Sequence, residues 1–151
     1  MTLVIFDEEA RQGMLGKNTP DIDVMLLLDF FGVEEGGKVL VVGAHDENTA
    51  NILADKGIEV YGVDLRDYDS SLPPCNYNYL RCDFCNLPKE FISEHLGTFD
   101  AVIALSCIEH FGMCAYMEGK SHSYYDIIAM RKVWEFLKVG GVAYVTVPFG
   151  G

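Results

Sequence analysis

Four residues with the chemistry to hold a ligand stand at the ends of short apolar runs in the sequence. They are a glycine, two acids and a serine: Gly43, Asp64, Asp83 and Ser106. A carboxylate accepts hydrogen bonds, and a glycine lets the backbone pass close to a bound molecule. If the runs are parallel strands, their carboxyl ends meet at one edge of a sheet, where ligands of such sheets bind. We therefore expect these residues, and Pro148 after a fifth run, to lie together.

The glycine and the first acid belong to one strand–helix–strand unit. The valine-rich run Lys38–Val42 stops at Gly43, and a helix-like segment, residues 48–56, follows. A second apolar run over residues 57–64 ends in the acid. Short runs that are apolar throughout are typical of strands buried on both faces. Asp64 follows Gly43 at roughly the 20-residue spacing at which the acid of a nucleotide-binding unit meets a ribose.

The whole pattern predicts an α/β protein with a doubly wound, mostly parallel sheet. We expect strands at residues 38–42, 57–64, 77–82, 99–105 and 142–147, and helices at 19–31, 48–56, 87–95 and 124–137. The last helix carries apolar residues near helical spacing: Ile127, Ile128, Met130, Val133, Trp134 and Leu137. A lysine and two glycines in residues 138–141 are expected to end this helix before the fifth strand. Residues 1–18 form an N-terminal extension, and residues 19–151 form one domain.

The composition limits the classes of partner. The chain has 151 residues, half of them hydrophobic, which is enough for one domain with a core. Its formal net charge of −12 argues against nucleic acid and against an anionic membrane surface, because both select basic proteins. No apolar run is long enough to span a bilayer, and the first residues lack the basic start of a signal peptide.

The cysteines and histidines give weaker signals. Five cysteines, an odd number, favour reduced thiols and a cytoplasmic location. Cys82 and Cys85 have the spacing of a metal or redox pair, but no second pair accompanies them. We interpret them as buried structural thiols and expect no metal site. His95 and His122 are expected at the surface.

Four stretches together give the chain a family resemblance. They are residues 39–46 (VLVVGAHD), 60–66 (VYGVDLR), 103–112 (IALSCIEHFG) and 133–148 (VWEFLKVGGVAYVTVP). With them the chain resembles the class I S-adenosylmethionine-dependent methyltransferases, most of all the small ones associated with sugar or cell-surface polysaccharide substrates. The resemblance covers roughly residues 19–150, and the last two stretches are its most specific part.

The resemblance implies S-adenosylmethionine as the cofactor and a small molecule as the methyl acceptor. The cofactor contacts that it implies are Gly43, Ala44, His45, Asp64, Leu65, Asp83, Phe84 and Ser106. Asp64 would accept hydrogen bonds from both ribose hydroxyls, and Asp83 from the adenine amino group, with Phe84 packed nearby. The Gly43 loop and Ser106 would lie beside the methionine part of the cofactor.

The sequence departs from the family pattern in two ways. The first motif of the family has an acid where this chain has Val41, and more glycine where it has His45 and Glu47. The family fold also continues with two further strands, whereas this sequence ends soon after the fifth. Either the sequence is a fragment, or the edge of the strand at residues 142–147 pairs with another subunit in a homo-oligomer.

His110 is the candidate general base, with Glu109 as the group that orients it. Imidazole titrates near neutral pH and could take a proton from an acceptor hydroxyl. Two alternatives stay open: His110 caps a helix or bonds to Glu109, or methyl transfer relies on positioning alone. Two other functions also stay open. One is a non-catalytic binding or oligomerisation module. The other is a nicotinamide-dependent oxidoreductase, which the missing G-x-G-x-x-G motif disfavours.

Overall fold

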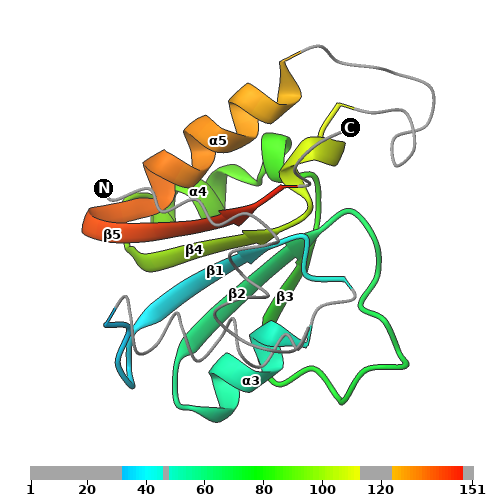
Figure 1. Cartoon of the computed structure of the whole chain (residues 1–151), viewed down its shortest axis with the longest axis vertical. Coiled ribbons are helices and arrows are strands. Elements are labelled where there is room, and N and C mark those ends of the chain that lie inside the picture. Colours follow the sequence, from blue (N-terminus) through cyan, green and yellow to red (C-terminus); the bar gives the residue numbers. More distant parts are fainter. Residues whose placement is uncertain (1–31, 46–47, 113–123, 148–151) are drawn as a thin grey trace, which may run out of the picture.

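Five parallel strands form one sheet in the computed structural model, which describes residues 32–45, 48–112 and 124–147 (Figure 1). The strands are β1 (Lys38–Val42), β2 (Glu59–Asp64), β3 (Asn78–Arg81), β4 (Phe99–Leu105) and β5 (Leu137–Thr146). Their order is β3-β2-β1-β4-β5, so the chain runs outward from β1 to β3 and then returns to the other side of β1. The predicted doubly wound parallel sheet is therefore confirmed, and its order reverses between β1 and β4. The predicted extension (1–18), the helix at 19–31, His122 and Pro148 lie outside the described residues.

Helices cover both faces of the sheet. In Figure 1, α3 (Thr49–Asp55) lies on one face, and α4 (Lys89–His95) and α5 (Tyr125–Phe136) lie on the other. Two short 3-10 helices, η1 (Phe84–Asn86) and η2 (Ile108–His110), follow β3 and β4 closely. No helix in the described part of the chain has the length and apolar character that crossing a membrane requires.

The central strand β1 explains why the first apolar run is so uniform. Val39, Leu40, Val41 and Val42 each expose 1% or less of their surface. Leu40 and Val42 belong to the core cluster that includes α5 residues, whereas Val39 and Val41 belong to the cluster that includes α3 residues. Successive side chains of a strand point to opposite faces, so a strand covered on both sides must be apolar at every position.

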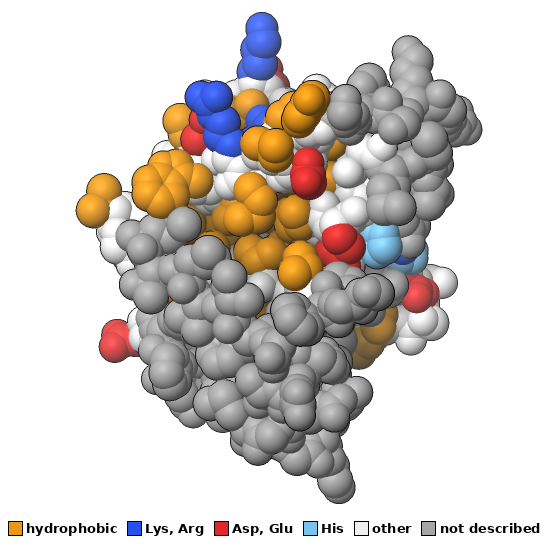
Figure 2. Space-filling model, turned by 45° about the horizontal axis from the view of Figure 1, so that its top comes forward, with side chains coloured by type: hydrophobic (Ala, Val, Ile, Leu, Met, Phe, Trp, Pro, Cys, Tyr) orange, Lys and Arg blue, Asp and Glu red, His pale blue; other side chains and the backbone are white. Residues whose placement is uncertain are grey.

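The face of α5 that meets the sheet is not the one that its largest apolar residues predicted. Ala129, Val133 and Phe136 are buried, whereas Ile127 and Trp134 expose 60% and 58% of their surface. Figure 2 shows hydrophobic side chains gathered on the exposed surface on this side of the molecule. The helix passes into β5 without a loop, so the path of that strand fixes which stripe of α5 faces the core.

The helix stop predicted at residues 138–141 is instead part of β5. Leu137 already pairs with Phe99 of β4, and pairing resumes at Val142 after a register shift. The intervening residues bulge out of the ladder, and Gly140 within them has a φ of +83°. Glycine adopts this left-handed conformation without the steric penalty of a side chain. The glycines that suggested a helix end therefore serve a strand bulge.

His95 is buried, although the sequence predicted it at the surface. It exposes 7% of its surface, and its ring centroid lies 4.5 Å from those of Tyr61 and Phe91. The Lys38 ammonium donates a hydrogen bond of 2.8 Å to the imidazole Nδ1. Burial lowers the pKa of the His95 imidazole, and the Lys38 charge lowers it further. Lys38 begins β1, so this cluster lies at the end of the strands opposite to Gly43.

This environment predicts a pH-dependent stability. Below about pH 6.5, the ordinary imidazole value, the unfolded chain binds a proton at His95 that the folded chain binds more weakly. The free energy of unfolding should therefore fall as the pH drops from about 7.5 to 5.5. In urea titrations at these two pH values, the fall in the free energy of unfolding should be smaller for His95→Gln than for the wild type. An equal or larger fall in the variant would contradict this assignment.

Candidate functional site

A cavity of about 330 Å³ opens where β1, β2 and β4 end, beside η1 and η2. Small-molecule sites in proteins usually occupy roughly 300–1,000 Å³, so this one is at the small end of that range. Seven of the ten residues predicted from the sequence line it: Gly43, Asp64, Leu65, Asp83, Phe84, Ser106 and His110. The carboxyl ends of the strands thus do bring the predicted glycine, acids and serine to one place.

The other three predicted residues, Ala44, His45 and Glu109, do not line the cavity. Ala44 has no exposed surface, and its carbonyl accepts a hydrogen bond from the Tyr77 hydroxyl at 3.4 Å. The His45 backbone N–H donates to Asp64 Oδ2 at 3.2 Å, and its ring Nδ1 contacts the Asp67 carbonyl. The loop after Gly43 therefore supports the Asp64 carboxylate from behind.

Gly43 is required by its conformation and by a close neighbour. Its φ is +78°, and a Cβ built on it would lie 2.7 Å from the Cys107 Cβ. The Cys107 thiol donates to the Val42 carbonyl at 3.2 Å, and Cys107 itself lines the cavity. The sequence suggested that Gly43 leaves room for a ligand, whereas here the room beside its backbone is taken by Cys107. Nothing in the spacing of the sequence indicated this contact.

The Asp64 carboxylate is the most heavily hydrogen-bonded group of the cavity. Oδ1 accepts from the Arg66 backbone N–H at 2.9 Å and from Arg66 Nε at 3.1 Å. Oδ2 accepts from the His45 N–H and from Arg66 Nη2, both at 3.2 Å. Arg66 also lines the cavity. Arg66 was not among the residues predicted from the sequence, although a basic residue two positions after the acid was the available signal.

Asp83 caps the start of η1. Its Oδ1 accepts a hydrogen bond of 2.8 Å from the Cys85 backbone N–H, and its Oδ2 accepts one from the Asn86 side-chain amide. Burial raises the pKa of the Cys82 thiol to about 11 and that of the Cys85 thiol to about 12. Protonated thiols are poor metal ligands and poor nucleophiles. In the described part of the chain, no three His, Cys, Asp or Glu side chains group as a metal site would require.

Ser106 turns the chain out of β4 in an unusual conformation. Its φ of +43° lies in the left-handed region that residues other than glycine rarely adopt. The Ser106 backbone N–H donates to both the carbonyl and the hydroxyl oxygen of Thr146 in β5, at 3.0 and 2.9 Å. Backbone strain of this kind is often found at functional sites. Here it holds the serine at the cavity wall.

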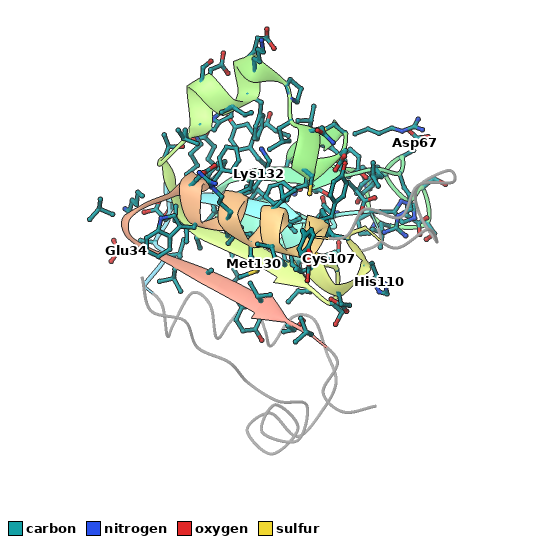
Figure 3. All side chains as sticks on the ribbon, turned by 90° about the horizontal axis from the view of Figure 1, so that it is seen from above. Glu34, Asp67, Cys107, His110, Met130 and Lys132 are labelled. Atoms are coloured by element: carbon teal, nitrogen blue, oxygen red, sulfur yellow. The ribbon has the colours of Figure 1, made fainter. Side chains whose placement is uncertain are left out.

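The pair Glu109–His110 lies on η2, beyond Ser106. His110 lines the cavity with 45% of its side chain exposed, and Figure 3 shows it near Cys107. Glu109 Oε1 lies 3.9 Å from His110 Nε2, which is within ion-pair range but too far for a hydrogen bond. Both Glu109 carboxylate oxygens are buried and accept no hydrogen bond from the described residues.

Comparisons with known proteins give matches at the level of structure. No protein-family model matches the sequence, and no curated protein does. A structure from Rhodobacter sphaeroides named for zinc-dependent alcohol dehydrogenases has a TM-score of 0.62 at 20% identity over 86% of this chain. The Burkholderia thailandensis 1,6-didemethyltoxoflavin-N1-methyltransferase, solved with S-adenosylhomocysteine, has a TM-score of 0.58 at 16% identity over 86%. A TehB-like SAM-dependent methyltransferase from Corynebacterium glutamicum has 0.57 at 17% identity over 88%.

These matches establish the architecture. The chain has a Rossmann-like methyltransferase fold. It spans 48%, 52% and 65% of the three matching structures, so the described sheet corresponds to part of each of those proteins. At such low identities, the likeness concerns the fold and leaves the chemistry of the cavity to be argued from its own residues.

The contact between Gly43 and Cys107 yields a stability prediction. Gly97 is a matched control, because its φ is +67° and no atom lies within 4 Å of a Cβ built on it. Gly97→Ala should therefore cost only the conformational penalty, about 1–2 kcal/mol. Gly43→Ala adds the clash with Cys107 and should cost at least about 1 kcal/mol more. Urea unfolding of both variants measures the difference, and equal losses would contradict the close contact.

Proposed function

We propose that the chain binds S-adenosylmethionine in this cavity and catalyses transfer of its methyl group to a small-molecule acceptor. The supporting observation is that Gly43, Asp64, Asp83, Ser106 and His110 converge where the strand order reverses. Two of the three matching structures described above are methyltransferases, one of them with S-adenosylhomocysteine bound. The fold alone also carries other chemistry, so the proposal depends on these residues.

The residues around the cavity fit an adenosine. Asp64 presents a carboxylate at the end of β2, where it would hold the two ribose hydroxyls. Leu65 exposes 37% of its surface at the cavity, and Phe84 forms a buried aromatic wall, so both would pack against the adenine. The oxygens of Asp83 each have a second lone pair to accept a hydrogen bond from the adenine amino group. The family motif has an acid at the position of Val41. Val41 is buried in the core cluster that includes α3 residues and does not line the cavity.

The positive charge of the cofactor fits the acidic side of the cavity. Glu109 is a buried carboxylate without a hydrogen bond from the described residues, one position from His110 on the cavity wall. A negative charge at low dielectric attracts a nearby cation strongly. We propose that Glu109 favours a cationic ligand in the cavity.

Bound S-adenosylmethionine supplies a methyl group on a sulfonium, which a nucleophile takes by in-line displacement. The electron pair of the carbon–sulfur bond would stay on sulfur while the acceptor oxygen or nitrogen bonds to the methyl carbon. His110 would take the proton that the acceptor loses, because its imidazole is half-exposed at the cavity. Glu109 would act as a positioning residue that stabilises the resulting imidazolium.

The remaining proposals concern acceptor, location and assembly. The resemblance of the four stretches suggests a sugar-like acceptor, and the net charge of −12 favours a small neutral or cationic molecule over nucleic acid. Cys75, Cys82 and Cys85 are free thiols, which suits the cytoplasm. β5 lies at an edge of the described sheet and could pair with a second subunit. Sedimentation over a range of protein concentrations tests that pairing, and a monomer throughout would rule it out.

Substitution of Asp64 tests the cofactor site. Asp64→Asn keeps the side-chain shape but removes the charge that would hold the ribose diol. We expect binding of S-adenosylhomocysteine, measured by calorimetry, to weaken by about tenfold to a hundredfold, as loss of charged hydrogen bonds implies. Asp67→Asn is the control, because its side chain is 79% exposed and pairs with Arg81 away from the cavity.

Three outcomes would contradict the proposal. Folded wild-type protein that binds neither S-adenosylmethionine nor S-adenosylhomocysteine would reject the cofactor. Thermal stabilisation by NAD alone would favour the oxidoreductase alternative. Cofactor binding without methylation of any small hydroxyl or amine acceptor, sugars included, would favour a non-catalytic module.

Substitution of His110 tests the proton transfer. His110→Gln retains a polar side chain of similar size but cannot act as a base. We expect turnover, measured as S-adenosylhomocysteine release with a responsive acceptor, to fall by about a hundredfold or more. Binding of S-adenosylhomocysteine should change little. Unchanged turnover would show that positioning suffices and that His110 has a structural role.

A further inference from the structure

The Asp64 carboxylate has no acceptor position left for a ligand. A carboxylate offers about four lone-pair positions, two on each oxygen. Oδ1 accepts from the Arg66 N–H and from Arg66 Nε, and Oδ2 accepts from the His45 N–H and from Arg66 Nη2. Asp64 exposes only 8% of its surface. A ribose can therefore reach this carboxylate only if one of the present donors leaves each oxygen.

Two of these four donors are fixed and two are able to move. The N–H groups of His45 and Arg66 belong to the backbone around the end of β2. The Tyr79 hydroxyl of β3 donates to the Arg66 carbonyl at 2.8 Å and thus anchors the backbone at that position. The Arg66 side chain is 39% exposed, whereas the Asp64 side chain is 6% exposed. Only the guanidinium can swing away while the backbone stays in place.

The two side-chain donors of Arg66 are placed as the two hydroxyls of a vicinal diol would be. Arg66 Nε donates to Oδ1 at 3.1 Å, and Nη2 donates to Oδ2 at 3.2 Å, which places one donor on each carboxylate oxygen. The two hydroxyls of a ribose, held by one carboxylate, would also place one donor on each oxygen. The planar guanidinium fork matches this geometry, which a lysine could not do.

We propose that Arg66 is a built-in competitor for the nucleoside subsite, so that its guanidinium and a ribose diol bind Asp64 in mutually exclusive ways. This inference rests on the proposed cofactor site and adds a regulatory contact to it. The fork keeps the buried carboxylate paired when no diol contacts it, and it selects ligands whose two hydroxyls can replace it together. The ion pair is partly exposed and therefore weak enough to be exchanged. Raised ionic strength should weaken it further.

The test compares Arg66→Ala with wild-type protein in calorimetric titrations with S-adenosylhomocysteine. We expect the variant to bind on the order of threefold to tenfold more tightly, as the modest strength of a partly exposed pair implies. Arg131→Ala is the matched control, because this arginine is also exposed and pairs with Glu135 on α5, and it does not line the cavity. Its affinity should equal that of the wild type.

A second pair of probes isolates the diol. Adenosine should gain affinity for the Arg66→Ala protein, whereas 2′,3′-dideoxyadenosine, which lacks both hydroxyls, should gain none. Arg66→Met keeps the aliphatic stem without the donors and should reproduce the gain, so a folding defect of the alanine variant would not mask the result.

The outcomes separate the two proposals. If wild-type protein binds S-adenosylhomocysteine and both Arg66 variants bind it equally or more weakly, the competitor is rejected while the cofactor site stands. A gain that is equal for the dideoxy analogue would also reject it, because the ribose would not be the competing group. If neither the wild type nor the variants bind any adenosine ligand, both proposals fail.

Discussion

The parallel pairing of β1 with β2 on one side and β4 on the other is the constraint on which the cavity depends. Val42 lies opposite Val63 in β2 and Ala104 in β4, so the three strands end at nearly the same height. The residues that follow must leave the sheet together at that edge. Gly43 and Asp64 are therefore brought together by backbone hydrogen bonds along the strands.

The edge is then closed by one turn from the other half of the sheet. Ser106 leaves β4 in a left-handed conformation that Thr146 of β5 fixes through two hydrogen bonds. This turn places Cys107 directly against Gly43, where any side chain on the glycine would collide with it. The two halves of the doubly wound sheet thus meet where the Cys107 side chain packs against the backbone of Gly43.

The charges around the cavity are unequally satisfied, and this inequality gives the site its chemical character. Asp64 accepts four hydrogen bonds, whereas the buried carboxylate of Glu109 accepts none from the described residues. One acid is therefore held in place until its movable partner is exchanged, and the other has charge available for a cation. The raised pKa values of Cys82 and Cys85 keep these two thiols protonated beside Asp83. A ligand with a diol at one end and a positive charge at the other would match this distribution.

The strands, their parallel arrangement and half of the residues that line the cavity could be predicted from the sequence, because burial on both faces leaves a continuous apolar run. The run Lys38–Val42 ends at a glycine and the run before Asp64 ends at an acid, and parallel strands bring such ends together. Contacts between distant residues leave no such pattern. The burial of His95 depends on its packing against Tyr61 and Phe91, and the bulge near Gly140 depends on where β5 meets β4.

The sequence by itself determined which strand ends meet at the cavity, since strand length and burial set where each strand ends along a sheet. Only the tertiary structure decided what those residues touch there. Arg66 stands two positions from Asp64, yet its fold-back onto the carboxylate depends on a backbone held by Tyr79 from the next strand. The partners of a side chain depend on rotamers and on neighbours that pack from other elements, and neither is encoded in local spacing.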